Sequence, residues 1–152
     1  MSSIKKNIAG KKFTAKKGLK VGIVQSLYNA QISGALLKSC MKTLLESDVS
    51  EKNIELVKVP GAFEIPFSCQ KLIKSSKPHV VIALGAVIRG GTPHFDFIAS
   101  SCATGIMDVS LKTEVPIVFG VLTTNNLAQA KARTDKGTEA ALTALQISNL
   151  NI

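Results

Sequence analysis

The chain has 152 residues, of which 45% are hydrophobic and 19% are charged, and its formal net charge is +9. This length supports one domain with an ordinary core, and the composition is that of a globular protein, not a disordered or fibrous one. Because no apolar run approaches the roughly 20 residues that a bilayer span needs, and the first twenty residues lack the apolar core of a signal peptide, we expect a cytoplasmic protein without a membrane partner.

The positive charge is concentrated at the start of the chain. Nine of the 19 Lys and Arg residues lie between Lys5 and Lys42, whereas from Thr43 onward ten basic residues face ten acidic ones. A solvated, flexible N-terminal arm (residues 1–18) ahead of a single domain (residues 19–152) accounts for this pattern. The alternative is an arm that attracts nucleic acid, a membrane or an acidic partner. No RNA-binding motif accompanies the lysines, so nucleic acid is not an expected partner.

Four short apolar runs predict strands, and the segments between them predict helices. The strands are expected at residues 20–25, 54–59, 80–87 and 116–122, each buried on both faces because its hydrophobicity is nearly continuous. The helices are expected at residues 32–47, 63–75, 93–110, 126–133 and 138–150. This alternation predicts an α/β fold, a flavodoxin-like three-layer sandwich with a parallel sheet of four strands, or five, and helices on both faces. Ligands of such sheets bind beyond the carboxyl ends of the strands.

Three cysteines, Cys40, Cys69 and Cys102, lie far apart and form no C-x-x-C pair. The spacing of a zinc site is therefore missing, and we expect no metal site. All three fall in predicted helices, where cysteine usually acts as a small apolar filler. A nucleophilic role is the alternative.

The end of the third strand carries the strongest functional signal. Gly90 and Gly91 would allow an unusual backbone path and the close approach of a ligand. Thr92 and Pro93 predict a helix N-cap and first helical residue, whose N–H groups form an anion site. His94 would follow at the positive end of the helix dipole, where a neutral imidazole suits acid–base chemistry. The alternative is a capped turn with an incidental histidine. Since both common nucleotide-binding glycine motifs are absent, the expected phosphate belongs to a small molecule.

The other strand ends each allow two interpretations. Phe63 and Glu64 would face the cleft, or form a hydrophobic staple and a favourable acidic first turn. Tyr28 could stack on a flat heterocycle or pack on a neighbouring loop. Arg133 could bind a phosphate or carboxylate through its planar fork, or stabilise a helix C-terminus, and Lys136 adds to either role.

Taken together, these strand ends resemble the lumazine synthases of the riboflavin pathway. The resemblance extends over residues 19–150, and its motifs are PGAFEIP (60–66), ALGAVIRGGTPHFD (83–96), PIVFGVLTTNNLAQAKAR (116–133) and KGTEAALTAL (136–145). It implies a condensation that uses no cofactor and no metal. In that reaction 5-amino-6-(D-ribitylamino)uracil and 3,4-dihydroxy-2-butanone 4-phosphate give 6,7-dimethyl-8-ribityllumazine, phosphate and water.

The resemblance also implies a role for each matching residue. His94 resembles the acid–base residue, and Gly91 and Thr92 resemble the phosphate site, with Arg133 and, across a gap, Lys136 as cationic partners. The ring and ribityl chain would lie against Tyr28, Ala62, Phe63, Glu64, Ala86, Val87, Ile88 and Phe119. In this family the site lies between subunits of a homopentamer, so residues matching Phe119 and Arg133 come from the neighbour. A functional link to riboflavin synthase is also implied.

Three positions depart from the family's usual pattern. Leu27 stands where the family usually has Arg, and Tyr28 replaces a more usual Phe or Trp, although stacking needs only a ring. The connection between Arg133 and Lys136 is only two residues long. Because this region influences whether pentamers assemble into icosahedral shells, we expect free pentamers. Leu27 and the short connection also motivate an alternative function, a binding module that holds the ligand without turnover.

Overall fold

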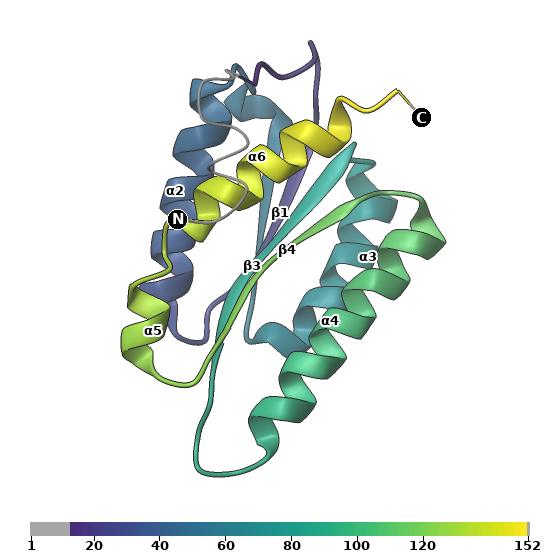
Figure 1. Cartoon of the computed structure of the whole chain (residues 1–152). Coiled ribbons are helices and arrows are strands. Elements are labelled where there is room, and N and C mark those ends of the chain that lie inside the picture. Colours follow the sequence, from purple (N-terminus) through teal and green to yellow (C-terminus); the bar gives the residue numbers. More distant parts are fainter. Residues whose placement is uncertain (1–12, 152) are drawn as a thin grey trace.

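Four parallel strands form one sheet in the order β2-β1-β3-β4 (Figure 1). A computed structural model describes residues 13–151, and all statements of structure concern these residues. The strands are β1 (Val21–Ser26), β2 (Ile54–Val59), β3 (Val80–Ile88) and β4 (Ile117–Thr124). Each predicted strand agrees with its observed counterpart to within two residues at either end.

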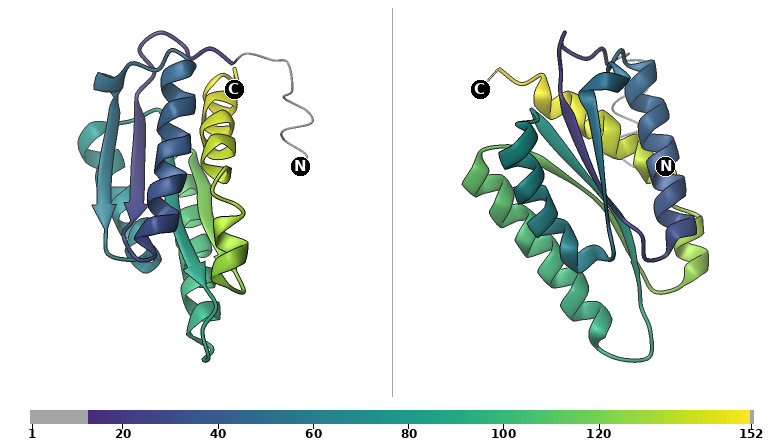
Figure 2. Two further views of the ribbon diagram at one scale, coloured as in Figure 1. Left: turned by 90° about the vertical axis from the view of Figure 1, so that its left-hand side faces the viewer. Right: turned by 180° about the vertical axis from the view of Figure 1, so that it is seen from behind.

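Helices cover both faces of this sheet, as Figures 1 and 2 show. One face carries α2 (Ala30–Glu46), α5 (Leu127–Lys131) and α6 (Lys136–Ser148). The other carries α3 (Ile65–Ser76) and α4 (His94–Thr113). Two short 3₁₀ turns, η1 (Glu51–Asn53) and η2 (Ala62–Glu64), flank β2, and the sequence pattern did not predict η1. The predicted helices match to within three residues, and the three-layer α/β sandwich with four parallel strands is confirmed.

Burial differs between the central and the edge strands. Every residue of β1 is buried, and so are the first seven of β3. At the edges, Leu56 of β2 is 39% exposed and Phe119 of β4 is 43% exposed. The expectation that all four strands are buried on both faces is therefore wrong for β2 and β4. Both strands lie at an edge of the sheet, with a neighbouring strand on one side only. The helices that cover the centre of the sheet therefore cover these edge strands incompletely.

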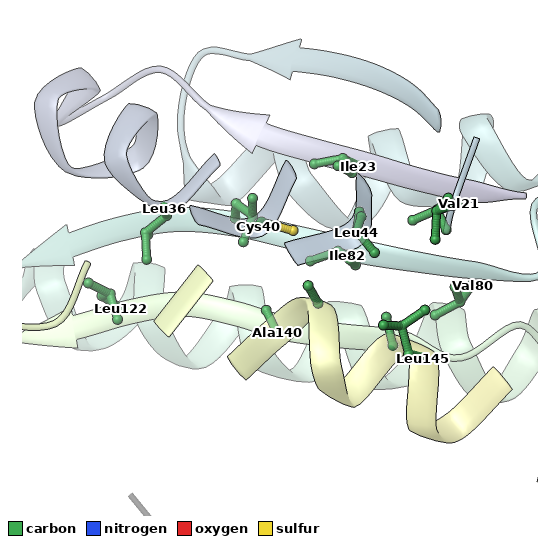
Figure 3. Close-up of a cluster of buried hydrophobic side chains, with 14 of the residues drawn as sticks. Val21, Ile23, Leu36, Cys40, Leu44, Val80, Ile82, Leu122, Ala140 and Leu145 are labelled. Carbon is green, nitrogen blue, oxygen red and sulfur yellow. The ribbon is translucent and has the colours of Figure 1, made fainter. Parts of the chain in front are cut away.

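Successive strand residues point to opposite faces and build two cores. The core under α2 and α6 is shown in Figure 3, and its members include Val21, Ile23, Leu36, Cys40, Leu44, Val80, Ile82, Leu122, Ala140 and Leu145. The core under α3 and α4 takes the alternate strand residues, among them Val24, Val81 and Ala83. The two cores hold the sheet rigid, so the loops at its carboxyl end are displayed on a fixed platform.

The three cysteines are members of these cores. Cys40 lies in the first core, and Cys69 and Cys102 lie in the second. Burial raises the pKa of the Cys40 and Cys69 thiols to about 12 and that of Cys102 to about 11. Their role as apolar fillers is confirmed, because a thiol that stays protonated is a poor nucleophile.

The last residues of the predicted N-terminal arm lie against the domain. Phe13 and Ala15 pack on the first core, and the Ala15 N–H donates to the Ser47 carbonyl at 2.8 Å. Residues 1–12 of the arm lie outside the described residues, so its flexibility stays a prediction. Within residues 13–151, none of the helices combines the length and the apolar character needed to cross a bilayer.

Candidate functional site

A cleft of about 750 Å³ opens where β1, β2 and β3 end and α4 begins. This volume lies in the usual range of small-molecule sites. Nine of the predicted site residues line it: Tyr28, Ala62, Phe63, Glu64, Ala86, Val87, Ile88, Thr92 and His94. We call it the His94 cleft. Its position at the carboxyl end of the sheet is the one that the strand order predicts.

Asn29 links the strand ends that form the cleft. It has a φ of 55°, in the left-handed region, and its side-chain Nδ2 donates to the Ala86 carbonyl at 2.9 Å. The preceding Tyr28 N–H donates to the Pro60 carbonyl at 2.9 Å, and the Tyr28 side chain is 74% exposed. Asn29 lines the cleft just beyond the end of β1, one of the strand ends where a ligand was expected, but no role was predicted for it. A sign of its conformation was present in the sequence, because asparagine is one of the few residue types that tolerate a positive φ, and Asn29 lies three residues after the end of β1.

Glu64 both shapes its turn and faces the cleft. Its Oε2 accepts a hydrogen bond from the Gly61 N–H at 2.9 Å, which closes the η2 turn ahead of α3. Pro66 lies in the first turn of α3, where its missing N–H costs no helical hydrogen bond. The Phe63 ring is 60% exposed at the cleft. One carboxylate oxygen of Glu64 is thus used by the backbone, while the residue and the Phe63 ring border the space for a ligand.

The loop between β3 and α4 carries His94. The helix begins at His94, one residue later than predicted, so Pro93 and not Thr92 takes the N-cap position, and no side chain caps the helix. Thr92 Oγ1 nevertheless accepts a long hydrogen bond from the His94 N–H, at 3.4 Å. The His94 side chain is exposed, and within residues 13–151 its imidazole makes no hydrogen bond. The helix start therefore presents the imidazole at the cleft wall beside N–H groups suited to an anion.

The two glycines of this loop differ from expectation. Gly18 is the glycine with a positive φ among residues 13–151, so neither Gly90 nor Gly91 takes the unusual backbone path that was predicted. A Cβ added to either would meet nothing within 4 Å, because the loop projects away from the domain (Figure 1). Gly90, and not the predicted Gly91, lines the cleft. Within one chain, neither a close contact nor the backbone conformation requires glycine at these two positions.

Three predicted residues lie elsewhere. Phe119, Arg133 and Lys136 line a separate hollow of about 650 Å³ along β4, between the C-terminal part of α4 and α6. We call it the β4 hollow. Within one chain the structure does not bring these residues together with His94.

Both cations of the β4 hollow have partners in their own chain. Arg133 Nη1 donates to the Gln129 carbonyl at 2.8 Å, at the end of α5, which is the predicted helix-stabilising alternative. Lys136 Nζ lies 2.7 Å from Glu139 Oε2, whose side chain is only 9% exposed. Glu139 was not among the predicted residues, although the three-residue spacing of opposite charges in KGTE was a signal for the pair.

The short connection before Lys136 is a fixed turn. The Ser39 hydroxyl, on α2, donates to the Thr134 carbonyl at 2.9 Å. Gly137 lies so close to the Leu36 carbonyl that a Cβ would overlap it. These contacts fasten the start of α6 to α2, so the position of Lys136 is set by helix packing.

Across the described residues, no three His, Cys, Asp or Glu side chains are arranged to hold a metal ion. The functional groups available are thus the imidazole, carboxylates, guanidinium, hydroxyls and backbone N–H groups of the two hollows. The 6,7-dimethyl-8-ribityllumazine synthase family model matches residues 18–151, a span that includes both the His94 cleft and the β4 hollow. The chain therefore belongs to the 6,7-dimethyl-8-ribityllumazine synthase family, whose members are transferases of riboflavin biosynthesis.

Proposed function

We propose that the chain condenses 5-amino-6-(D-ribitylamino)uracil with 3,4-dihydroxy-2-butanone 4-phosphate to 6,7-dimethyl-8-ribityllumazine, releasing phosphate and water. The main support from the geometry is the His94 cleft, which places a histidine, a helix N-terminus, a carboxylate and two exposed aromatic rings around one space. The reaction needs proton transfer, an anion site for the leaving phosphate, and a flat surface for the pyrimidine. The cleft offers each of these.

His94 is placed to move protons beside the leaving group. An amine of the pyrimidine attacks the ketone to form an imine and water, and removal of a carbon-bound proton then allows phosphate to leave. The second amino nitrogen closes the new ring with loss of a second water. The imidazole lies at the start of α4 close to Thr92, whose hydroxyl accepts from the His94 N–H at 3.4 Å. A phosphate held by this helix start would therefore lie within reach of the group that transfers the proton.

The other cleft residues are suited to hold the pyrimidine and its ribityl chain. Tyr28 and Phe63 are 74% and 60% exposed, so their rings are free to contact a flat heterocycle. Ala86, Val87 and Ile88 form the end of β3 along the cleft, and Glu64 can accept hydrogen bonds from hydroxyl groups. Holding both substrates in one orientation lowers the barrier without further chemistry.

A neighbouring subunit would complete the site. Phe119 and Arg133 lie in the β4 hollow of the same chain, so we propose that a second copy supplies them to the His94 cleft within a homopentamer. Three large apolar side chains on α4, Phe97, Met107 and Leu111, are 69%, 59% and 70% exposed, which supports burial against other copies. We propose free pentamers over icosahedral shells, the cytoplasm as the compartment, and riboflavin synthase as the functional partner that takes the product.

One assay tests the reaction. The protein is mixed with both substrates, and lumazine formation is followed by absorbance and fluorescence against a mixture without protein. A rate well above this background is expected. A rate equal to the background, together with tight binding of the pyrimidine, would instead establish the alternative of a binding module without turnover.

A further inference from the structure

Arg89, the residue directly after β3, contacts two other segments with its side chain. Its Nη2 and Nη1 donate to Asp96 Oδ1 and Oδ2 at 2.8 and 3.1 Å, a two-point contact with the first turn of α4. Its guanidinium carbon lies 4.3 Å from the centre of the Phe95 ring. Its Nε donates to Asn125 Oδ1 at 3.4 Å, in the turn after β4. One side chain thus joins the end of β3 to α4 and to the end of β4.

The loop that this contact closes has little other support. Residues 90–94 are all exposed, and a Cβ on Gly90 or Gly91 would meet no atom within 4 Å. On the β3 side, the Arg89 N–H donates to the Thr124 carbonyl at 2.9 Å and so continues the pairing of β3 with β4. His94, the first residue of α4, therefore follows an exposed loop whose two ends are joined through Arg89 and Asp96.

The geometry of the contact between Arg89 and Asp96 indicates that its main effect is to orient the segments that it joins. Exposed ion pairs usually contribute little to stability, and here the two side chains are 41% and 59% exposed. A guanidinium bound to a carboxylate at two points nevertheless fixes angle as well as distance. Hydrogen bonding between the partners raises the pKa of Arg89 and lowers that of Asp96, so both remain charged at neutral pH.

We propose that Arg89 is a positioning residue for His94. By holding Asp96 and Phe95, it fixes the first turn of α4 against the ends of β3 and β4, and so fixes the imidazole in the His94 cleft. Phe95 supports this route, because it lines the cleft next to His94 and lies against the guanidinium. The consequence for turnover rests on the proposed function, whereas the position of the imidazole does not.

Histidine NMR tests the position without using activity. The chain has two histidines, and His79 provides an internal control, because its Nδ1 accepts from the Lys20 N–H at 2.9 Å at the opposite end of β3. With ¹³C-labelled histidine, the Arg89→Gln and Asp96→Asn variants are expected to shift or broaden the ring signals of His94. The signals of His79 should stay in place.

Kinetics test the consequence. Both variants are expected to lower kcat by about 10–100-fold while KM changes little, since misplacement of a catalytic group acts on the chemical step. The double variant should lose no more than either single one, and exchange of the charges in Arg89→Asp/Asp96→Arg should recover part of kcat. Lys112→Gln and Asp108→Asn are matched controls, because this exposed pair lies on the same helix, 3.7 Å apart, and should leave kcat unchanged.

The outcomes are separable. If the wild type makes no product, the proposed function fails, and the His94 signals alone decide whether Arg89 positions the imidazole. Unchanged His94 signals in folded variants would overturn the proposal, and so would unchanged kcat in an active enzyme. Should Arg89→Gln fail to fold, Asp96→Asn carries both measurements, because it preserves the shape of the side chain.

Discussion

The two hollows of this chain differ in how their polar groups are used. In the His94 cleft, the imidazole of His94 makes no hydrogen bond within residues 13–151, and two aromatic rings are largely exposed. In the β4 hollow, Arg133 and Lys136 each already contact a group of their own chain. The polar groups of the His94 cleft are therefore available to a ligand. In the β4 hollow, Arg133 or Lys136 must first give up a contact within its own chain before it can bind a ligand.

The two cations of the β4 hollow are not equally free to make this exchange. Arg133 donates to a backbone carbonyl at the exposed end of α5, and a phosphate would offer it a stronger, charged acceptor. Lys136 is paired with Glu139, which is buried, so its departure would leave an unpaired carboxylate. The difference supports the proposal that Arg133 binds the phosphate, and we propose that Lys136 instead stabilises the start of α6.

The largest expected effect concerns the His94 cleft itself. If His94 is the principal proton carrier, His94→Ala should lower kcat by roughly 10²–10⁴-fold. His79→Ala is the control, since His79 lies at the other end of β3 and should retain wild-type turnover. Turnover close to wild type in His94→Ala would leave the residue only a role at the helix end, with catalysis resting on positioning.

A smaller but more specific effect tests whether the two hollows meet across subunits. Arg133→Ala alone should lose about 10–100-fold in activity, as expected for a charged hydrogen bond to phosphate. If His94→Ala and Arg133→Ala chains are co-refolded in equal amounts, random mixing should give about one quarter of the sites both native groups, and with them that share of wild-type activity.

The mixed sample should have the mass of five chains, which native mass spectrometry checks. As a control, two preparations of the same variant are mixed with each other, and this mixture should gain no activity. If mixed oligomers recover no activity, His94 and Arg133 of each site come from one chain. This result would contradict the proposal that the two hollows meet across subunits.

The fold was largely predictable because the strands are short apolar runs and the helices between them have a clear hydrophobic period. What the prediction did not include was strand order: the apolar run of β4 is nearly continuous, like those of β1 and β3, and only pairing makes it an edge. In β2, the charged Glu55 and Lys58 were a sign of an edge strand, because charged side chains commonly protect such edges. The edge position of β4 in turn explains why Phe119 is partly exposed and lies in a hollow away from His94.

The site was predictable where position follows from a strand end. Thr92, His94 and Glu64 were found in this way, because parallel strands bring their carboxyl ends to one edge. The hydrogen bond from Asn29 to Ala86 and the pairing of Glu139 with Lys136 were not predicted, because only the folded chain forms these contacts.

The smallest expected effect distinguishes the roles of Lys136. Lys136→Met should lower the free energy of unfolding by about 1–2 kcal/mol, because it leaves the Glu139 carboxylate buried without its partner. Glu139→Gln should lower the free energy of unfolding by less. The double variant Lys136→Met/Glu139→Gln should recover most of the stability that Lys136→Met loses. Urea unfolding measures these changes, and KM for the phosphate-bearing substrate is followed in parallel. A stable Lys136→Met variant with a greatly raised KM would instead place Lys136 with Arg133 at the phosphate. Lys136 would then pair with Glu139 only in the absence of substrate. Like Arg133, it would leave this contact within its own chain when the substrate binds.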